Sequence, residues 1–132
     1  MQYEPGLSRG ELIHLATQKY FASVDAKNID ATLACFQDEA LFCVQTAFAR
    51  HSGKAELRRM FEDFFGAWQT IVHHDFTCTV DEKNARITAS FEAVLTGHDG
   101  SVTRLSNTNF WRVRDGKFQE VYVYMSGGNP LI

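Results

Sequence analysis

The sequence predicts an α+β fold in which three helices come first and a mainly antiparallel, curved sheet follows. In the first half of the chain, apolar residues recur at helical spacing, and from about residue 70 the spacing changes to alternation. Consecutive strands joined by short turns pair antiparallel, and helices that precede them cover one face of the sheet. Because 132 residues are one domain's worth of chain, we expect a single domain over residues 1–132.

The first helix is expected over residues 8–26, where Ser8 can cap the N-terminus and Glu11 completes a capping box. A second, short helix is expected over 29–36 and a third over 53–68. The third helix has one wide apolar face. This face consists of Leu57, Met60, Phe61, Phe64, Phe65 and Trp68. We expect it to be mainly core, with Phe65 and Trp68 lining a cavity near the helix end.

Residues 40–48 are mostly apolar and predict a buried strand. Four further strands are expected, separated by turn residues, at 71–80, 86–97, 102–114 and 117–125. The dipeptide Asp115-Gly116 is the strongest hairpin signal, since both residues tolerate the left-handed conformations that a tight turn needs. These strands form the expected sheet.

The last two strands carry rings on both faces. Alternation places Val121, Val123 and Met125 on one side of the last strand, and Phe118, Tyr122 and Tyr124 on the other. In the strand before it, Trp111 and Phe110 point to opposite faces. Either these are scattered surface aromatics, or the outer face packs on another subunit. We expect the second arrangement, a homodimer through the outer sheet face.

The overall charge argues against a nucleic-acid partner, because the net charge is −3 with mixed signs and no basic face is evident. Three widely spaced cysteines without a CxxC motif indicate free thiols in a reducing compartment. The N-terminus has no apolar leader and no run approaches 18 apolar residues. We therefore expect a cytoplasmic protein that does not contact a membrane.

The sequence lacks the motifs GxxxxGK, GxGxxG after a strand, HExxH and GxSxG. Nucleotide hydrolysis, dinucleotide redox chemistry, zinc peptidase and serine hydrolase activity therefore have no support. His73 and Asp75 alternate on one strand face as two possible metal ligands, but no third ligand has a readable spacing. We expect neither a metal nor a cofactor.

The order of elements resembles a known superfamily. A first helix with a Tyr, the segment VDAKNIDATLACFQDEALF, a helix opened by Gly, and a four-stranded meander ending NFWRVRDGKFQEVYVYMSG resemble the nuclear transport factor 2-like superfamily. Within it, the chain is most similar to the SnoaL-like and ketosteroid-isomerase-like branch over roughly residues 9–128. The resemblance implies a cone-shaped α+β barrel around an apolar pocket. It does not imply one reaction, because this fold hosts isomerases, dehydratases, cyclases, hydrolases and binding domains.

The resemblance also implies roles for individual residues. Ketosteroid isomerases use a Tyr of the first helix as an oxyanion donor, and Tyr20 occupies that position. Their proton-transferring Asp corresponds to Val44, which cannot carry a proton. Their second oxyanion donor corresponds to Asn109, whose amide still donates a hydrogen bond. Two donors remain while that base is missing, so steroid-type isomerisation by the same mechanism is not expected.

Polar residues in otherwise apolar segments are the further candidates. Asn107, Asn109 and Trp111 share one strand face, and the two Asn are either a structural pair or a polar spot in a pocket. His73 and His74 face opposite sides of their strand. We expect His74 to enter the pocket, because it alternates with the more apolar set that includes Phe76. It is either a buried or rim histidine or a general acid–base.

We therefore expect Tyr20, His74 and Asn109 to be catalytic if the protein is an enzyme. Expected ligand-binding residues are Val44, Phe61, Phe65, Trp68, Phe91, Asn107, Trp111, Val123 and Met125. The preferred hypothesis is a cofactor-free lyase, isomerase or cyclase that acts on a small hydrophobic molecule bearing a carbonyl group. The alternatives are binding of an apolar ligand without turnover and a dimeric protein-interaction module.

Overall fold

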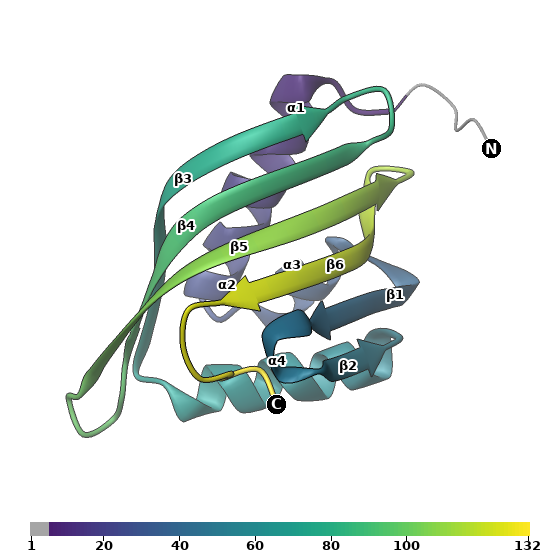
Figure 1. Cartoon of the computed structure of the whole chain (residues 1–132). Helices are drawn as coiled ribbons and strands as arrows, with labels where there is room; N and C mark the ends of the chain where they lie inside the picture. Colours follow the sequence, from purple (N-terminus) through teal and green to yellow (C-terminus); the bar gives the residue numbers. More distant parts are fainter. Residues whose placement is uncertain (1–5) are drawn as a thin grey trace.

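The computed structural model describes residues 6–132; residues 1–5, at the start of the segment in which no leader is expected, lie outside the described residues. Helices precede strands along the chain, as predicted. A six-stranded sheet curves around the helices and forms with them the expected cone-shaped α+β arrangement (Figure 1). Within the described range, no helix is both long and apolar enough to cross a membrane.

The predicted first helix consists of three consecutive stretches, namely α1 (Arg9–Ile13), a π-helical stretch (His14–Tyr20) and α2 (Phe21–Asp25). The expected capping box is present at its start. The Ser8 hydroxyl accepts from the Glu11 amide at 3.2 Å, and the Glu11 carboxylate accepts from the Ser8 amide at 3.0 Å. This cap fixes where the helix begins, and the apolar side chains of the helix then face the sheet.

Two further helices follow, α3 (Ile29–Leu33) and α4 (Lys54–Ala67). The helix α3 ends earlier than the predicted residue 36. The Cys35 carbonyl accepts from the Phe118 amide at 2.7 Å, and Phe36 pairs with Phe118 in the sheet. A strand partner distant in sequence therefore overrides the local helical spacing.

The strands are β1 (Phe36–Val44), β2 (Ala49–Ser52), β3 (Thr70–Asp81), β4 (Arg86–Thr96), β5 (Val102–Arg114) and β6 (Lys117–Met125). They are ordered β2-β1-β6-β5-β4-β3 in one sheet. Among the strand pairs of residues 6–132, only β1–β6 is parallel. The strand predicted at 40–48 thus begins and ends earlier, and the short β2 was not predicted.

The β5–β6 hairpin turns at Asp115 and Gly116, both with positive φ (51° and 75°), as their sequence predicts. A register shift follows, since Arg112 pairs with Glu120 whereas Val113 pairs with Phe118. The extra residue in β6 reverses the alternation. Phe118 is consequently fully buried in the core, and its expected place on the outer face is wrong.

Helices cover the concave face of the sheet and leave the convex face open (Figure 1). The core between them is rich in aromatic rings: Tyr20 alone meets Phe36 and Phe118 edge-on at centroid distances of 5.6 and 5.4 Å. On the open face, Phe110 and Tyr124 are each 44% exposed. The concave side therefore holds both the core and the candidate site.

Candidate active site

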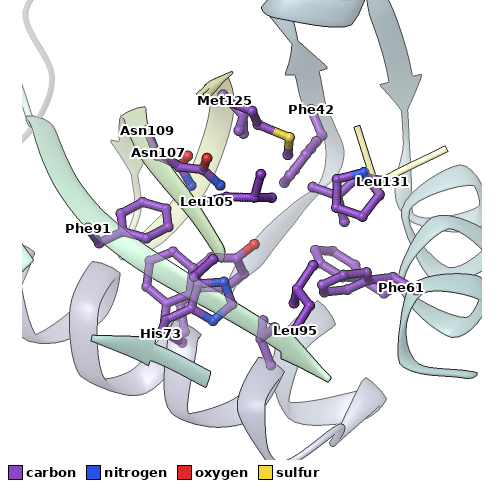
Figure 2. Close-up of a pocket in the computed structure, with 17 residues that line it drawn as sticks. Phe42, Phe61, His73, Phe91, Leu95, Leu105, Asn107, Asn109, Met125 and Leu131 are labelled. Carbon is purple, nitrogen blue, oxygen red and sulfur yellow. The ribbon is translucent and has the colours of Figure 1, made fainter. Parts of the chain in front are cut away.

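A pocket with a cavity of about 30 Å³ opens between the helices and the concave face of the sheet. Its wall is mostly apolar and draws on the first helix, α4, five strands and the C-terminal segment. The lining residues are Tyr20, Phe21, Val24, Phe42, Phe61, Phe64, His73, Phe91, Ala93, Leu95, Leu105, Asn107, Asn109, Val123, Met125, Pro130 and Leu131. Figure 2 shows how ten of these converge from different elements.

Two carboxamides supply polarity on one side of the pocket. Asn107 and Asn109 lie side by side on β5 and point into the pocket (Figure 2). They are only 6% and 3% exposed, and the Oδ1 atom of each has no hydrogen-bond partner among the described residues. Their cross-strand neighbours on the two adjacent strands are Ala89, Phe91, Val123 and Met125. Since none of these side chains has an N–H or O–H donor, the pocket is where a partner can come from.

Tyr20 reaches the pocket from the helical side and is 3% exposed. Burial, with smaller contributions from Cys35 and Asp25, raises the pKa of its phenol far above the ordinary value. The hydroxyl therefore stays protonated through the physiological range. It is a neutral hydrogen-bond donor and does not act as a base.

A histidine and a carboxylate meet at the edge of the pocket. The His73 Nδ1 atom lies 2.5 Å from Asp25 Oδ1, and the His73 amide donates to Asp25 Oδ2 at 2.9 Å. The His73 side chain is 8% exposed, and its ring stacks on Phe21 at 4.3 Å. A carboxylate only accepts, so Nδ1 carries the hydrogen and, in the neutral ring, Nε2 carries the lone pair.

The structure corrects the choice between the adjacent histidines. His73 lines the pocket, whereas the His74 side chain is 44% exposed and pairs with Asp75 outside it. The register along β3 shifts between His74 and Thr77, with Asp75 at φ 60°. This bulge reverses the alternation, so that His73 and Phe76 share the inner face. The prediction that His74 shares the inner face with Phe76 was wrong, because it assumed unbroken alternation between the two residues.

The other expected site residues divide into two groups. Seven line the pocket: Tyr20, Phe61, Phe91, Asn107, Asn109, Val123 and Met125. Four lie outside its wall: Val44, Phe65, Trp68 and Trp111. Trp111 is core, stacked on Phe118 at 5.7 Å, and Val44 is fully buried. Phe65 packs against Phe61 and Phe64.

Sequence reasoning did not assign Asp25, His73 or several apolar lining residues to the site, among them Phe42, Leu105 and Leu131. Asp25 follows the predicted apolar stripe, but its partner His73 is 48 positions away, so no local spacing links them. Pro130 and Leu131 lie beyond the last expected strand, which ends at residue 125, so strand alternation gives no sign of them. Within the described part of the chain, no three His, Cys, Asp or Glu residues are grouped as metal ligands.

Comparison with solved structures shows the same fold at low sequence identity. A Xanthomonas campestris protein provisionally assigned as a polyketide cyclase superposes with a TM-score of 0.78 and 20% identity, over 88% of this chain and 90% of that one. A Bacillus subtilis protein provisionally assigned as an isomerase gives 0.79 and 17%, over 91% and 90%. The epoxide hydrolase/cyclase-like enzyme SalBIII, for which a role in pyran ring formation is described, gives 0.80 and 14%, over 90% and 93%.

No curated protein matches the sequence. The family model described as the SnoaL-like domain, however, matches residues 17–121. This stretch contains Tyr20, the Asp25–His73 pair and both pocket carboxamides, and it accounts for most of the chain. The chain therefore belongs to the SnoaL-like domain family, within the nuclear transport factor 2-like superfamily that its sequence resembles.

Proposed function

We propose that this protein is a cofactor-free enzyme that moves a proton on a small, hydrophobic, carbonyl-bearing substrate. The pairing of His73 with Asp25 beside two buried carboxamides carries the proposal. A base, hydrogen-bond donors and an apolar wall are what proton abstraction next to a carbonyl requires. The fold neighbours include proteins provisionally assigned as a polyketide cyclase and an isomerase, and an epoxide hydrolase/cyclase-like enzyme.

In the proposed reaction, the lone pair on His73 Nε2 takes a proton from the carbon next to the substrate carbonyl. The electron pair of that C–H bond moves into the carbonyl, and an enolate oxygen forms. The Asn109 amide and the Tyr20 hydroxyl donate to this oxygen, each as a donor already in place. Asp25 holds the tautomer of His73 and stabilises the imidazolium that results.

The fate of the enolate decides the reaction class. Return of the proton from His73 to a different carbon is an isomerisation. Loss of a hydroxyl from the neighbouring carbon, which takes the proton from His73 and leaves as water, is a dehydration. Attack of the enolate carbon on a second carbonyl, whose oxygen takes the proton from His73, closes a ring. Asn107 supports the broader proposal, since a pair of carboxamides can hold a carbonyl oxygen and a hydroxyl side by side.

The test is exchange of the α-protons of cyclohexanone in D2O, followed by proton NMR. We expect the protein to accelerate the exchange, and His73→Gln to lower the rate by about 10²–10⁴-fold, the typical contribution of a general base. His74→Gln is the matched control, because the neighbouring ring lies outside the pocket. Equal rates for the two variants, both folded, would contradict the proposal. Binding of the rigid apolar bicycle 2-naphthol, without any α-proton exchange, would instead favour the alternative of ligand binding without turnover.

We also propose that two copies associate through the convex face of the sheet. Phe110 and Tyr124 form an edge-on pair there with ring centroids 5.7 Å apart. Next to this pair, Phe110, Arg112, Glu120 and Tyr122 border a hollow of about 250 Å³. Exposed rings around a hollow are typical of surfaces that pack on another protein.

A further inference from the structure

The C-terminal strap, defined here as residues 126–132, forms part of the pocket wall. After β6 the chain turns back toward α4 (Figure 1). Pro130 and Leu131 line the pocket, and Leu131 is 8% exposed. In Figure 2, Leu131 lies across the pocket from Asn107 and Asn109, between Phe42 and Phe61. The strap thus contributes apolar atoms opposite the two carboxamides.

The space left beside the strap is too small for an organic ring. The cavity measures about 30 Å³, whereas a dry cavity that accepts benzene has about 150 Å³. A hydrophobic carbonyl compound therefore enters only when part of the wall moves. Apart from Pro130 and Leu131, every lining residue belongs to a helix or a strand. The strap is the part of the wall whose displacement breaks no sheet or helix hydrogen bonds.

Two residues latch the strap from outside the pocket. Arg59 on α4 donates to the Ile132 main-chain oxygen at 3.2 and 3.3 Å. His51 on β2 lies with Nε2 3.3 Å from the Leu131 carbonyl and Nδ1 3.4 Å from an Arg59 nitrogen. Because a guanidinium only donates, Nδ1 accepts and Nε2 carries the hydrogen that Leu131 receives. These hydrogen bonds hold Leu131 in place, yet they are few.

The two ends of the strap differ in their freedom. A Cβ atom at Gly127 would lie 2.6 Å from Leu105 Cδ2. Because glycine has no side chain, the main chain can pass close to Leu105 where it leaves β6. A side chain at Gly128 would meet nothing within 4 Å, and glycine has wide backbone freedom, so Gly128 is the candidate pivot. Beyond the pivot, the Leu131 amide donates to Asn129 Oδ1 at 2.8 Å. Asn129–Leu131 is therefore a pre-formed turn that can move as a unit.

We propose that the strap is an internal competitor of the ligand, with Leu131 occupying the place of an apolar group of the substrate. Binding then requires the strap to swing out about Gly128, and the latch at Arg59 sets how often the pocket is open. The inference rests on the proposed function only for the location of the ligand site. The inference places a subsite next to Leu105 and Phe61, and this subsite accepts a branched aliphatic group or a ring.

The test is fluorescence titration with 2-naphthol, a rigid apolar bicycle whose single hydroxyl can donate to an Asn carboxamide oxygen. Arg59→Gln unlatches the strap, and Arg58→Gln is its matched control. Both arginines are half-exposed on α4 and pair with an acidic residue four positions on, but Arg58 makes its other contact to Asp30. Because apparent affinity scales with the open fraction, we expect Arg59→Gln to bind about five- to tenfold tighter than wild type. Arg58→Gln should match wild type.

Leu131→Ala provides a second variant. It shortens the side chain that occupies the pocket and leaves the main-chain oxygens that Arg59 and His51 contact in place. It too should bind 2-naphthol more tightly. Equal affinities for wild type and the two strap variants, weaker binding by either, or no binding by any of them would overturn the inference. The titration reads binding alone. Failure of α-proton exchange would therefore overturn the proposed function and leave the strap inference standing, whereas unchanged 2-naphthol affinities would do the reverse.

Discussion

The Asp25 carboxylate accepts two hydrogen bonds from His73, one from Nδ1 at 2.5 Å and one from the main-chain amide at 2.9 Å. The two contacts fix both the position and the orientation of the imidazole. Asp25 sits at the end of α2 and His73 near the start of β3, so the pair also ties the helical layer to the sheet. The helix thus orients a base whose main chain belongs to the sheet.

Asp25→Asn should impair proton transfer more than binding. An Asn side chain can also donate to Nδ1, which favours the tautomer with hydrogen on Nε2 and removes the lone pair from the pocket. We expect kcat for cyclohexanone exchange to fall by about 10²-fold or more with KM little changed. Nitrogen NMR of the His73 ring would report the tautomer directly. A normal tautomer with normal kcat would contradict the positioning role of Asp25.

Regular alternation made most of the sheet predictable. β5 and β6 have the predicted bounds, and β3 and β4 differ from them only at their ends. Irregular points were not predictable in the same way. The bulge in β3 and the extra residue in β6 each reverse the facing of the residues on one side, which moved His73 and Phe118 inward. A bulge leaves the composition of a strand unchanged, so one sequence gives little sign of it.

Part of the pocket wall was predictable from regular alternation. Asn107, Asn109, Val123 and Met125 alternate on neighbouring strands, and all four line the pocket. The partner of His73 and the closing strap depend on contacts between segments far apart in the chain. Their positions follow from the packing of α2 on β3 and of the strap on α4, which residue spacing does not encode.

The bulge in β3 can be tested through its backbone. Asp75 holds φ at 60°, a region that Asp tolerates and that a β-branched residue strongly disfavours. Asp75→Val should lower the free energy of unfolding by about 1–2 kcal/mol and reduce exchange by displacing His73. Asp75→Gly should be nearly neutral, since the exposed pair with His74 contributes little. Urea denaturation compares them, and equal losses would contradict the strain argument.

Tyr20 should make the protein sensitive to alkali. Burial raises its pKa in the folded state above the ordinary value of 10.0. Above pH 10 the unfolded chain loses this proton while the folded chain keeps it, so stability present below pH 10 falls as pH rises. The slope is at most about 1.4 kcal/mol per pH unit. Tyr20→Phe should therefore lose less stability between pH 9 and pH 11 in urea denaturation. A loss equal to that of wild type would contradict this prediction.

If two copies associate through the convex face, the mass in solution is twice that of the monomer. Light scattering at micromolar concentration should give this value for wild type. Phe110→Lys places a charge beside Tyr124 and should shift the mass toward that of the monomer. Phe48→Lys is the control, because Phe48 is 96% exposed in the turn between β1 and β2 and does not border the hollow. A wild-type monomer would exclude the dimer, and loss of association in both variants would exclude this particular interface.

Asn107 and Asn109 should cost stability in the absence of ligand. Each buries a carboxamide oxygen without a partner, and such a group destabilises by about 1–3 kcal/mol. Asn109→Leu keeps the branched shape of the side chain and removes that cost, so we expect the free energy of unfolding to rise by about 1 kcal/mol while α-proton exchange falls. Thr108→Val, on the opposite face of β5, should leave exchange unchanged. A less stable Asn109→Leu variant would show that the carboxamide is held for the fold, and an active one would exclude Asn109 as the oxyanion donor.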